Sequence, residues 1–252
     1  MTKIVLSGCN GKMGQAIVRC VTQREDVSIV AGVDICTSSE YDFPVFDDFS
    51  KVSIDADVVI DFSNPTILDG LLTYVTKKAL PVIICTTGFS PEQVTQIQDT
   101  SKKTAVFYSG NMSLGINLML ELAKKATALL CADFDIEIIE KHHNQKIDAP
   151  SGTALMIADS IAEELPKEPI YIYDRHSYRK KRDKKEIGIH AVRGGSIVGE
   201  HEVIFAGHDE VISIKHEAHS KEVFAIGSIN AAVYLKGKKA GMYNMSDLIL
   251  AK

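Results

Sequence analysis

Short apolar segments alternate with amphipathic segments along the first half of the chain. The apolar segments are apolar along most of their length, which is typical of strands buried on both faces of a sheet. They lie at residues 3–7, 28–34, 56–62, 81–85 and 104–108. Apolar residues at helical spacing occupy 12–23 and 66–78, and Pro91 suits the first turn of another helix. The sequence therefore predicts a parallel sheet with helices on both faces.

The pattern of apolar positions changes after about Leu114. A helix is expected first, with Leu118, Leu122, Ala126 and Leu129 on its apolar face. Further strands are expected at 134–140, 187–192, 199–207 and 210–217, and further helices at 152–165 and 223–235. The strands after residue 186 alternate in polarity, which favours an antiparallel arrangement. The segment 241–250 is expected to return to the first group of elements.

Composition and charge narrow the class of protein. The chain has 252 residues, 45% of them apolar and 24% charged, with a formal net charge of -5 and a sequence pI of about 5.9. This balance disfavours general binding to nucleic acid or to an anionic membrane. The apolar runs are shorter than the roughly 20 residues of a membrane span, and the run after Lys3 is too short for a signal peptide. The five cysteines form no C-x-x-C pair, which favours reduced thiols in the cytoplasm over disulfides or a metal site.

A glycine-rich loop follows the first predicted strand. Gly8, Gly11 and Gly14 are spaced G-x-x-G-x-x-G between that strand and a helix, and the backbone N–H groups of such a loop can hold a pyrophosphate. Asp34 ends the second strand, 20 residues after Gly14, at the spacing of a carboxylate that binds the adenosine ribose. Together these features predict an α/β fold with a Rossmann-type parallel sheet domain. The alternative is a glycine turn in a flavodoxin-like fold that does not bind this cofactor.

The residues after Asp34 bear on the choice of dinucleotide. Ile35 is apolar, and no Lys or Arg occurs before Lys51 to pair with a 2′-phosphate. We therefore expect NADH to be preferred over NADPH, although Thr37 and Ser38 offer hydroxyl groups to a phosphate.

The sequence EKHHNQKIDAPSGTAL at 140–155 gathers groups suited to acid–base chemistry. His142, His143 and Lys146 follow a predicted strand and can supply protons or bind carboxylates. The Ser-Gly-Thr segment at 151–153 can cap the next helix, and that helix start is also an anion site. The alternative is a helix cap next to solvated basic residues.

This segment resembles the signature of the 4-hydroxy-tetrahydrodipicolinate reductase (dihydrodipicolinate reductase) family of lysine and diaminopimelate synthesis. The resemblance covers the whole chain, since four other segments also match: GCNGKMG at 8–14, CTTGF at 85–89, SGNMSLGINLM at 109–119 and GMYNMSDLI at 241–249. It implies hydride transfer from NADH or NADPH to a small cyclic dicarboxylate by a homotetrameric enzyme. It also implies a dinucleotide-binding domain at 1–113 and 223–252, with an inserted α+β domain at 114–222 for substrate binding and tetramerisation.

The resemblance implies roles for particular residues. His142 is expected as a proton donor or acceptor, Lys146 as a proton donor, and His143, Gly152 and Thr153 as substrate contacts. The expected cofactor contacts are Gly8, Cys9, Asn10, Gly11, Lys12, Met13, Asp34, Cys85, Thr86, Thr87, Ser109, Gly110, Asn111 and Met112. Cys85 stands where the family usually has glycine, and it is interpreted either as an oxidation-sensitive thiol or as a small buried residue.

Two polar features have structural interpretations. The basic run at 174–185 is interpreted as a solvated, mobile loop, with substrate steering or nucleic-acid binding as alternatives. Five histidines show no compact metal-ligand motif and are expected on strand faces or at the surface: His190, His201, His208, His216 and His219. The residues alone also leave open another Rossmann reductase, such as an aspartate dehydrogenase, and a regulatory protein that senses NAD(H) without turnover.

Overall fold

The computed structural model describes residues 1–38, 40–177 and 179–251. The chain divides into two compact units, which we call the first unit, Met1–Leu114 with Lys221–Lys252, and the second unit, Gly115–Ser220. No helix within the described ranges is long and apolar enough to cross a membrane.

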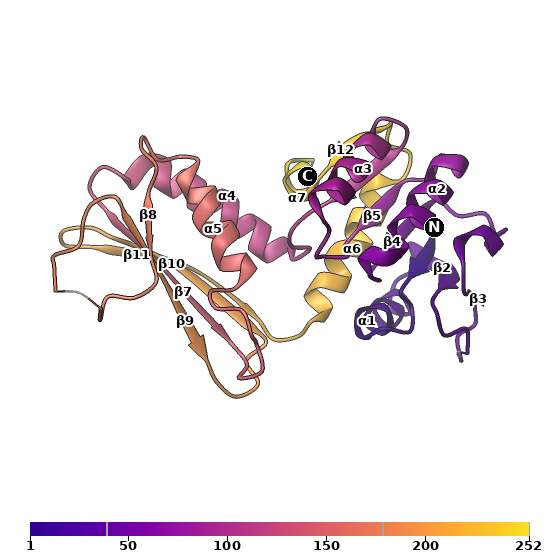
Figure 1. Ribbon diagram of the computed structural model, residues 1–252, viewed down its shortest axis with the longest axis horizontal. Coiled ribbons are helices and arrows are strands. Elements are labelled where there is room, and N and C mark those ends of the chain that lie inside the picture. The colour runs from indigo at the N-terminus through magenta and orange to yellow at the C-terminus, as the bar shows by residue number, and fades with distance from the viewer. Residues whose placement is uncertain (39, 178, 252) are drawn as a thin grey trace. The chain divides into compact units, whose positions relative to one another are not determined.

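Among the described residues, seven parallel strands form the sheet of the first unit, in the order β12-β6-β5-β4-β1-β2-β3 (Figure 1). Their bounds are β1 Thr2–Ser7, β2 Val27–Val33, β3 Val45–Phe46, β4 Val58–Asp61, β5 Val82–Ile84, β6 Ala105–Tyr108 and β12 Gly241–Tyr243. The order reverses between β1 and β4, and ligands of open α/β sheets bind at such a reversal, outside the carboxyl ends of the strands. The pairing of β12 with β6 confirms that the segment after residue 240 returns to this sheet.

Helices cover both faces of this sheet. Their bounds are α1 Lys12–Val21, α2 Leu68–Lys78, α3 Pro91–Ser101, α6 Glu222–Leu235 and α7 Met245–Leu250, with short 3-10 turns at Phe49–Lys51 and Pro65–Ile67. Neighbouring residues of one strand enter different cores: Ile4 and Leu6 pack with α1 and α6, whereas Val5 packs with α2 and α3. Burial on both sides explains why these strands are nearly continuous apolar runs. The predicted fold class is confirmed.

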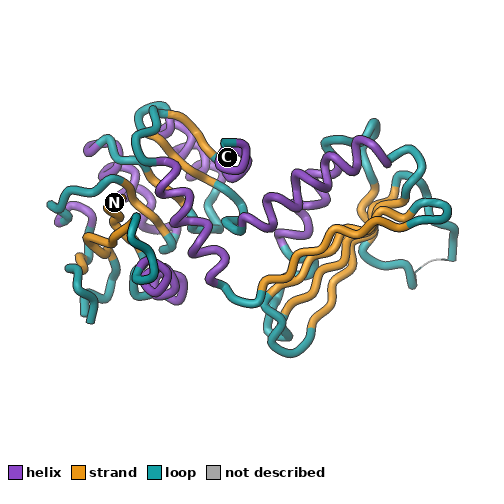
Figure 2. Tube along the Cα trace, turned by 180° about the vertical axis from the view of Figure 1, so that it is seen from behind, coloured by secondary structure: helices purple, strands orange, loops and turns teal. Residues whose placement is uncertain are grey.

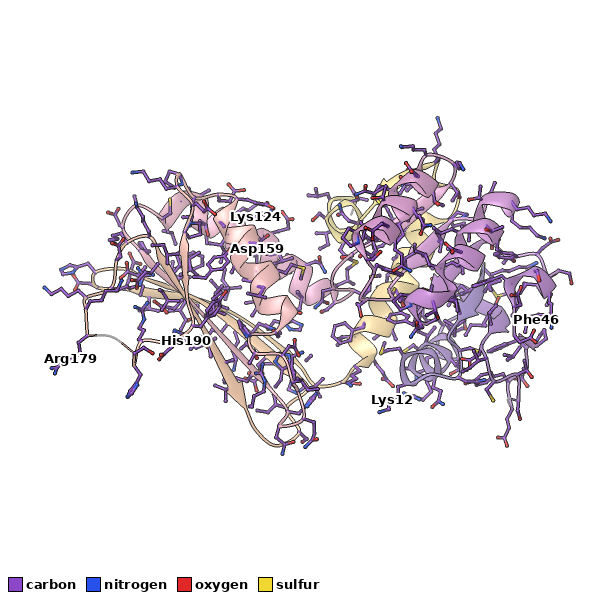
Figure 3. The ribbon with its side chains drawn as sticks, viewed as in Figure 1. Lys12, Phe46, Lys124, Asp159, Arg179 and His190 are labelled. Atoms are coloured by element: carbon purple, nitrogen blue, oxygen red, sulfur yellow. The ribbon has the colours of Figure 1, made fainter. Side chains whose placement is uncertain are left out.

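The second unit is a mixed sheet with helices on one face (Figure 2). Its strands lie in the order β11-β10-β7-β9-β8. The bounds are α4 Leu114–Leu130, β7 Asp135–His142, α5 Gly152–Ala162, β8 Ile170–Ile172, β9 Glu186–Arg193, β10 Gly199–Ala206 and β11 Val211–Ala218. β10 runs antiparallel to β7 and β11, whereas β9 runs parallel to β7 and β8. Lys124 on α4, Asp159 on α5 and His190 on β9 are labelled in Figure 3.

The two faces of this second sheet differ in burial. Ile136 and Ile138 of β7 and Phe205 of β10 pack against α4 and α5. The alternate residues of β7 and β10 are only partly buried and point to the opposite face. A sheet with one covered face produces the polar alternation that the sequence shows.

Three expectations for the second unit were wrong. β9 was expected to be antiparallel but is parallel to its neighbours. Alternating polarity indicates that one face of a strand is exposed, and it does not indicate the direction of the strand. β7 extends to His142, which continues the buried alternation of Ile138 and Glu140. The basic run at 174–185 is not simply solvated, because Arg175 and Arg182 form ion pairs with carboxylates of β7 and β9. A carboxylate that is partly buried needs such a positive partner. Residue 178 of that run lies outside the described residues.

Candidate active site

The loop between β1 and α1 is shaped by two glycines. Gly8 has a φ of +74°, and a Cβ there would lie 2.4 Å from the carbonyl oxygen of Phe62. A Cβ at Gly14 would lie 2.2 Å from the carbonyl oxygen of Gly8. The loop therefore turns closely on itself and over the end of β4. The first turn of α1 begins directly behind it, with N–H groups that have no intrahelical partner and suit an anion.

A cavity of about 620 Å³ lies beside this loop, and its lining includes Gly8, Asp34 and Ile35. The Asp34 carboxylate faces the loop: Oδ2 accepts the N–H of Asn10 at 3.0 Å, and Oδ1 accepts the N–H of Cys36 at 3.1 Å. Ile35 is 94% exposed. The loop and the acidic residue predicted for a dinucleotide site therefore lie at one cavity, at the reversal of strand order.

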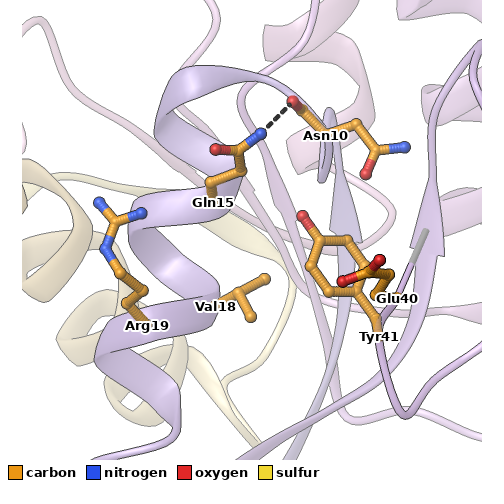
Figure 4. A pocket seen from close by; sticks show the side chains of 6 residues that line it. All are labelled: Asn10, Gln15, Val18, Arg19, Glu40 and Tyr41. Atoms are coloured by element: carbon orange, nitrogen blue, oxygen red, sulfur yellow. Dashed lines mark hydrogen bonds between the residues drawn. The ribbon is translucent and has the colours of Figure 1, made fainter.

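Asn10 also lines a smaller cavity of about 360 Å³, together with Gln15, Val18 and Arg19 of α1 (Figure 4). Gln15 Nε2 donates to the Asn10 carbonyl oxygen at 3.0 Å, and Asn10 Nδ2 donates to the Cys36 carbonyl oxygen at 2.6 Å. The Tyr41 hydroxyl donates to the Cys9 carbonyl oxygen at 3.1 Å. These side-chain hydrogen bonds hold the loop at residues 8–14 in its conformation. Gln15 and Tyr41 were not predicted from the sequence, because side-chain hydrogen bonds to a loop have no characteristic spacing.

A buried carboxylate ties the ends of β4 and β5 together. Asp61 is 1% exposed, and it accepts hydrogen bonds from Thr86 Oγ1 at 2.6 Å and from Ser63 Oγ at 2.5 Å. The Ser63 N–H donates to Thr86 Oγ1 at 2.9 Å. Burial raises the pKa of Asp61, and the hydroxyl donors oppose that shift. The network fixes the loop that carries Thr86, a predicted cofactor contact.

The other predicted cofactor residues lie at the same edge of the sheet. Because β1, β4, β5 and β6 are parallel neighbours, the loops that follow them share the carboxyl edge. Thr86 and Thr87 follow β5, and residues 109–112 follow β6. Ser109 Oγ donates to the Asn111 carbonyl oxygen at 3.1 Å, which closes a tight turn there.

Cys85 directly follows β5 at this edge. Burial raises the pKa of its thiol well above the usual range, and the nearby Asp61 carboxylate raises it further. The sulfur is therefore a protonated thiol, and the thiolate is the form that oxidises readily. This favours the interpretation of Cys85 as a small packed residue.

In the second unit, a buried carboxylate contacts His142, the histidine predicted to exchange a proton. Glu140 of β7 is 0% exposed. Arg193 donates to both of its oxygens, at 2.6 Å to Oε1 and 2.7 Å to Oε2. Nδ1 of His142 lies 2.6 Å from Oε2, and the N–H of Ser151 donates to Oε1 at 2.9 Å. The cluster thus joins β7, β9 and the start of α5.

A second histidine lies against His142. The ring of His201 on β10 is edge-on to it, with ring centroids 5.2 Å apart, and Nε2 of His201 is 3.2 Å from Ser151 Oγ. Burial lowers the pKa of His201 to about 4, so this ring is neutral at physiological pH. Burial also lowers the pKa of His142, and Glu140 opposes that shift. Gly199 leaves room for the ring, since a Cβ there would lie 3.1 Å from Nε2 of His142.

Lys146 lies in the loop between β7 and α5, where it faces a carboxylate of its own chain. Its Nζ is 2.9 Å from Asp148 Oδ1, and this contact lowers the pKa of Asp148. The backbone N–H of Gly152 lowers that pKa further. The Asp148 carbonyl oxygen accepts Nη2 of Arg193 at 2.6 Å. Lys146 and the start of α5 therefore converge on one carboxylate.

The structure brings His142, Lys146, Gly152 and Thr153 to one end of the second unit, around the start of α5. His143 is half-buried, and within the described part of the chain its Nδ1 has no hydrogen-bond partner. Among the described residues, no group of three or more His, Cys, Asp or Glu side chains is arranged to hold a metal ion.

The ion pair of Glu140 and Arg193 at the centre of this site was not predicted from the sequence. The sequence does contain an indication of it: Ile138, Glu140 and His142 alternate on one face of a strand. A carboxylate on a buried face requires a positively charged or hydrogen-bonding partner. That partner, Arg193, is the last residue of β9 and lies 53 residues from Glu140 in the sequence, so no local spacing links the two.

Comparisons with known proteins place both units in one family. Residues 2–112 match the family model for the N-terminus of dihydrodipicolinate reductase, and residues 115–249 match the model for its C-terminus. The 4-hydroxy-tetrahydrodipicolinate reductase of Clostridium tetani is 54% identical over 249 residues, which cover 99% of this chain and 97% of the relative. That of Clostridium novyi is 51% identical over the full length of both chains.

Solved structures agree with this placement. The dipicolinate-bound dihydrodipicolinate reductase from Paenisporosarcina sp. TG-14 superposes with a TM-score of 0.82 at 27% identity and covers 97% of each chain. A myo-inositol dehydrogenase from Corynebacterium glutamicum shares the fold, with a TM-score of 0.60 at 15% identity over 100% of this chain and 93% of its own. The predicted resemblance is confirmed: this chain belongs to the dihydrodipicolinate reductase family.

Proposed function

We propose that the protein is a 4-hydroxy-tetrahydrodipicolinate reductase that forms tetrahydrodipicolinate in lysine and diaminopimelate biosynthesis. The observation that carries the proposal is the arrangement at 140–153, where His142 is held by Glu140 and Lys146 converges with the start of α5 on a carboxylate. A protein that only senses a dinucleotide has no need of an acid–base pair beside a carboxylate site. Membership of the family makes this reaction the natural use of the arrangement.

NADH or NADPH is proposed as the reductant, held in the cavity beside the loop at 8–14. The residues fit this group, because Gly8 and Gly14 let the backbone approach a pyrophosphate and the Asp34 carboxylate suits ribose hydroxyls. When bound, the nicotinamide supplies the hydride. We expect NADH to be preferred, since the exposed, apolar Ile35 stands where a 2′-phosphate would need a cation. The other proposed contacts are Cys9, Asn10, Gly11, Lys12, Met13, Cys85, Thr86, Thr87, Ser109, Gly110, Asn111 and Met112.

The second unit is proposed to bind the substrate and manage the proton. His142 exchanges a proton with the substrate, and Lys146 donates one. His143, Gly152 and Thr153 contact the substrate. The Asp148 carboxylate lies between the Lys146 ammonium and the N–H of Gly152, and both of these groups attract a negative charge. A substrate carboxylate could bind to the same two groups.

A homotetrameric, cytoplasmic enzyme that does not bind nucleic acid is proposed as the working form. The face of the second sheet opposite α4 and α5 supports assembly, because apolar side chains lie on it among the charges: Ile139 and Ile204 are half-buried, and Val192 is 45% exposed. Light scattering measures the assembly: four chains per particle are expected, and a monomer would contradict this part of the proposal.

The direct test is oxidation of NADH with and without the substrate, made freshly by its synthase. We expect oxidation only with the substrate. His142→Gln should lower kcat mainly, whereas His143→Gln should raise KM mainly, because the first loses a proton carrier and the second a contact. The reverse pattern would exchange the roles of the two histidines, and no oxidation by the wild type would refute the proposed function.

A further inference from the structure

The carboxylate of Glu140 occupies a position that is costly for a charge. Its side chain is 0% exposed, on the face of β7 that also buries Ile138 and His142. Arg193 compensates the charge with paired bonds of 2.6 and 2.7 Å. An apolar residue would fill such a position without the cost of removing two charges from water. The charge therefore needs a reason beyond packing, and the 2.6 Å contact with Nδ1 of His142 supplies one.

We propose that Glu140, held by Arg193, is a positioning residue that fixes the proton of His142 on Nδ1 and leaves Nε2 to exchange a proton with the substrate. An ionised carboxylate only accepts hydrogen bonds, so the ring nitrogen that faces it carries the proton. Nε2 is then the atom whose proton the reaction moves. The inference rests on the proposed function, because that function assigns the proton exchange to His142.

The charged and titratable groups around the ring come from three strands and a loop. Glu140 shares β7 with His142, Arg193 ends β9, His201 lies on β10, and Lys146 lies in the loop before α5. Burial, Lys146 and Arg193 all disfavour a second proton on His142, and His201 is neutral at physiological pH. Glu140 is the negative member of this set. It therefore stabilises the doubly protonated ring that forms whenever Nε2 gains a proton.

The opposite face of β7 offers a matched control. Glu137 also contacts a histidine, with Nε2 of His190 at 2.8 Å, and it contacts two arginines, with Nη2 of Arg175 at 3.0 Å and Nε of Arg182 at 2.9 Å. Because residues 137 and 140 are an odd number of positions apart on one strand, their side chains point to opposite faces. The Glu137 side chain is 21% exposed. Glu137→Gln therefore removes the same charge from the same strand without reaching His142.

The test compares Glu140→Gln with Glu137→Gln in the full-length protein. NMR of protein labelled with 15N-histidine reports the protonation of each ring nitrogen, and His142→Gln identifies the signals of His142. In the wild type near neutral pH we expect the proton of the neutral ring on Nδ1. In Glu140→Gln we expect the pKa of His142 to fall and kcat to drop by roughly tenfold or more, since the range runs from about tenfold for the partner of a metal-bound imidazole to about 10⁴-fold for the carboxylate of a catalytic triad. The limb of the kcat–pH profile that belongs to His142 should move to lower pH.

Glu137 lies on the sheet face proposed for assembly, so light scattering first checks that Glu137→Gln has the particle mass of the wild type. The ring tautomer, kcat and the pH profile of that variant should then be unchanged. A wild-type ring protonated on Nε2 would overturn the inference, and this measurement does not depend on any variant folding. Equal shifts of the pH profile in the two variants would also overturn it, since Glu140 would then be a structural residue only. The NMR result does not depend on turnover, so a wild type with the proton on Nδ1 but no reductase activity would refute the proposed function, and with it the proton exchange at Nε2, while the assignment of the proton to Nδ1 would stand.

Discussion

The two predicted binding sites are built from different parts of the polypeptide. In the first unit, the loop at 8–14 presents backbone, and its shape depends on Gly8 and Gly14, where a Cβ would collide with carbonyl oxygens. In the second unit, the groups proposed to handle the proton are side chains, and a Cβ on Gly152, at the start of α5, would meet no heavy atom within 4 Å. A site made of backbone loses its ligand when a close-packed glycine is replaced, but it tolerates changes of the side chains around it. A site made of side chains loses its function when one of those side chains is removed, but it tolerates a new side chain at a glycine that has free space.

The largest effect is expected from a side chain of the second unit. Lys146→Ala should lower turnover by ~10²-fold or more, as is usual for a lost proton donor. NADH binding should persist, because the proposed cofactor site is made of other residues. The matched control is Lys124→Ala, which removes a lysine paired with Glu163 at 2.6 Å on the helices of the same unit. Steady-state kinetics measure the turnover of the two variants, and titration measures their NADH binding. Near-normal turnover in Lys146→Ala would contradict the role of Lys146 as proton donor.

The histidine cluster should also make stability depend on pH. The folded pKa of His201 is about 4, against an ordinary 6.5, so between these values the unfolded chain binds more protons than the folded chain. Stability should therefore fall as pH drops from about 6.5 to about 4, by up to ~3 kcal/mol from this one residue. His201→Gln, which does not titrate, should flatten that dependence, whereas His208→Gln at an exposed site should not. Urea unfolding at several pH values, followed by circular dichroism, compares them. An unchanged slope in His201→Gln would show that His201 is not the group responsible.

The backbone site should fail at its glycine. Gly14→Ala should weaken NADH binding by about tenfold, a strain cost near 1.4 kcal/mol, because the new methyl group forces the loop away from the Gly8 carbonyl oxygen. Gly152→Ala has free space and should fold and bind NADH normally. Isothermal titration with NADH compares the two. If both alanines behaved alike, the contrast between the two sites would have no basis.

The smallest effect is expected from adding a side chain to the rim of the backbone site. The wild type should use NADH better than NADPH. Ile35→Arg should improve kcat/KM for NADPH by roughly fivefold, the equivalent of about 1 kcal/mol from a charged hydrogen bond. Kinetics at low and high salt with both cofactors provide the measurement. Equal or better use of NADPH by the unmutated protein would contradict the role given to Asp34 and Ile35.

The backbone site was accessible to prediction from the sequence because its parts are local. A strand, a glycine loop, a helix and Asp34 follow one another within a short stretch, and each has a periodicity or a spacing of its own. The strands beside it were predicted for the same reason, apart from the two-residue β3, which is too short to show a period.

The centre of the side-chain site was harder to predict because its parts are distant in sequence. Glu140 and Arg193 meet only because β9 pairs with β7 in parallel, in a register that sets His142 opposite Arg193. Polar alternation does not encode the direction or the register of a strand, so neither the ion pair nor the place of His201 followed from the pattern. The His142–Lys146 segment was found only because its residues are near neighbours in sequence.

The path of the chain also sets the order in which the molecule can be built during synthesis. Residues 115–220 form one uninterrupted stretch, so the second unit is complete before the ribosome reaches α6. The first unit is not, because Ala225, Ile229 and Leu235 of α6 are fully buried in its core and β12 adds the outer strand beside β6. Until those residues emerge, one face of the nascent parallel sheet lacks its cover and exposes apolar surface. The inserted unit can thus fold on the ribosome ahead of the unit that encloses it in sequence, and the stretch of translation in between is when the chain is most open to aggregation and to chaperones.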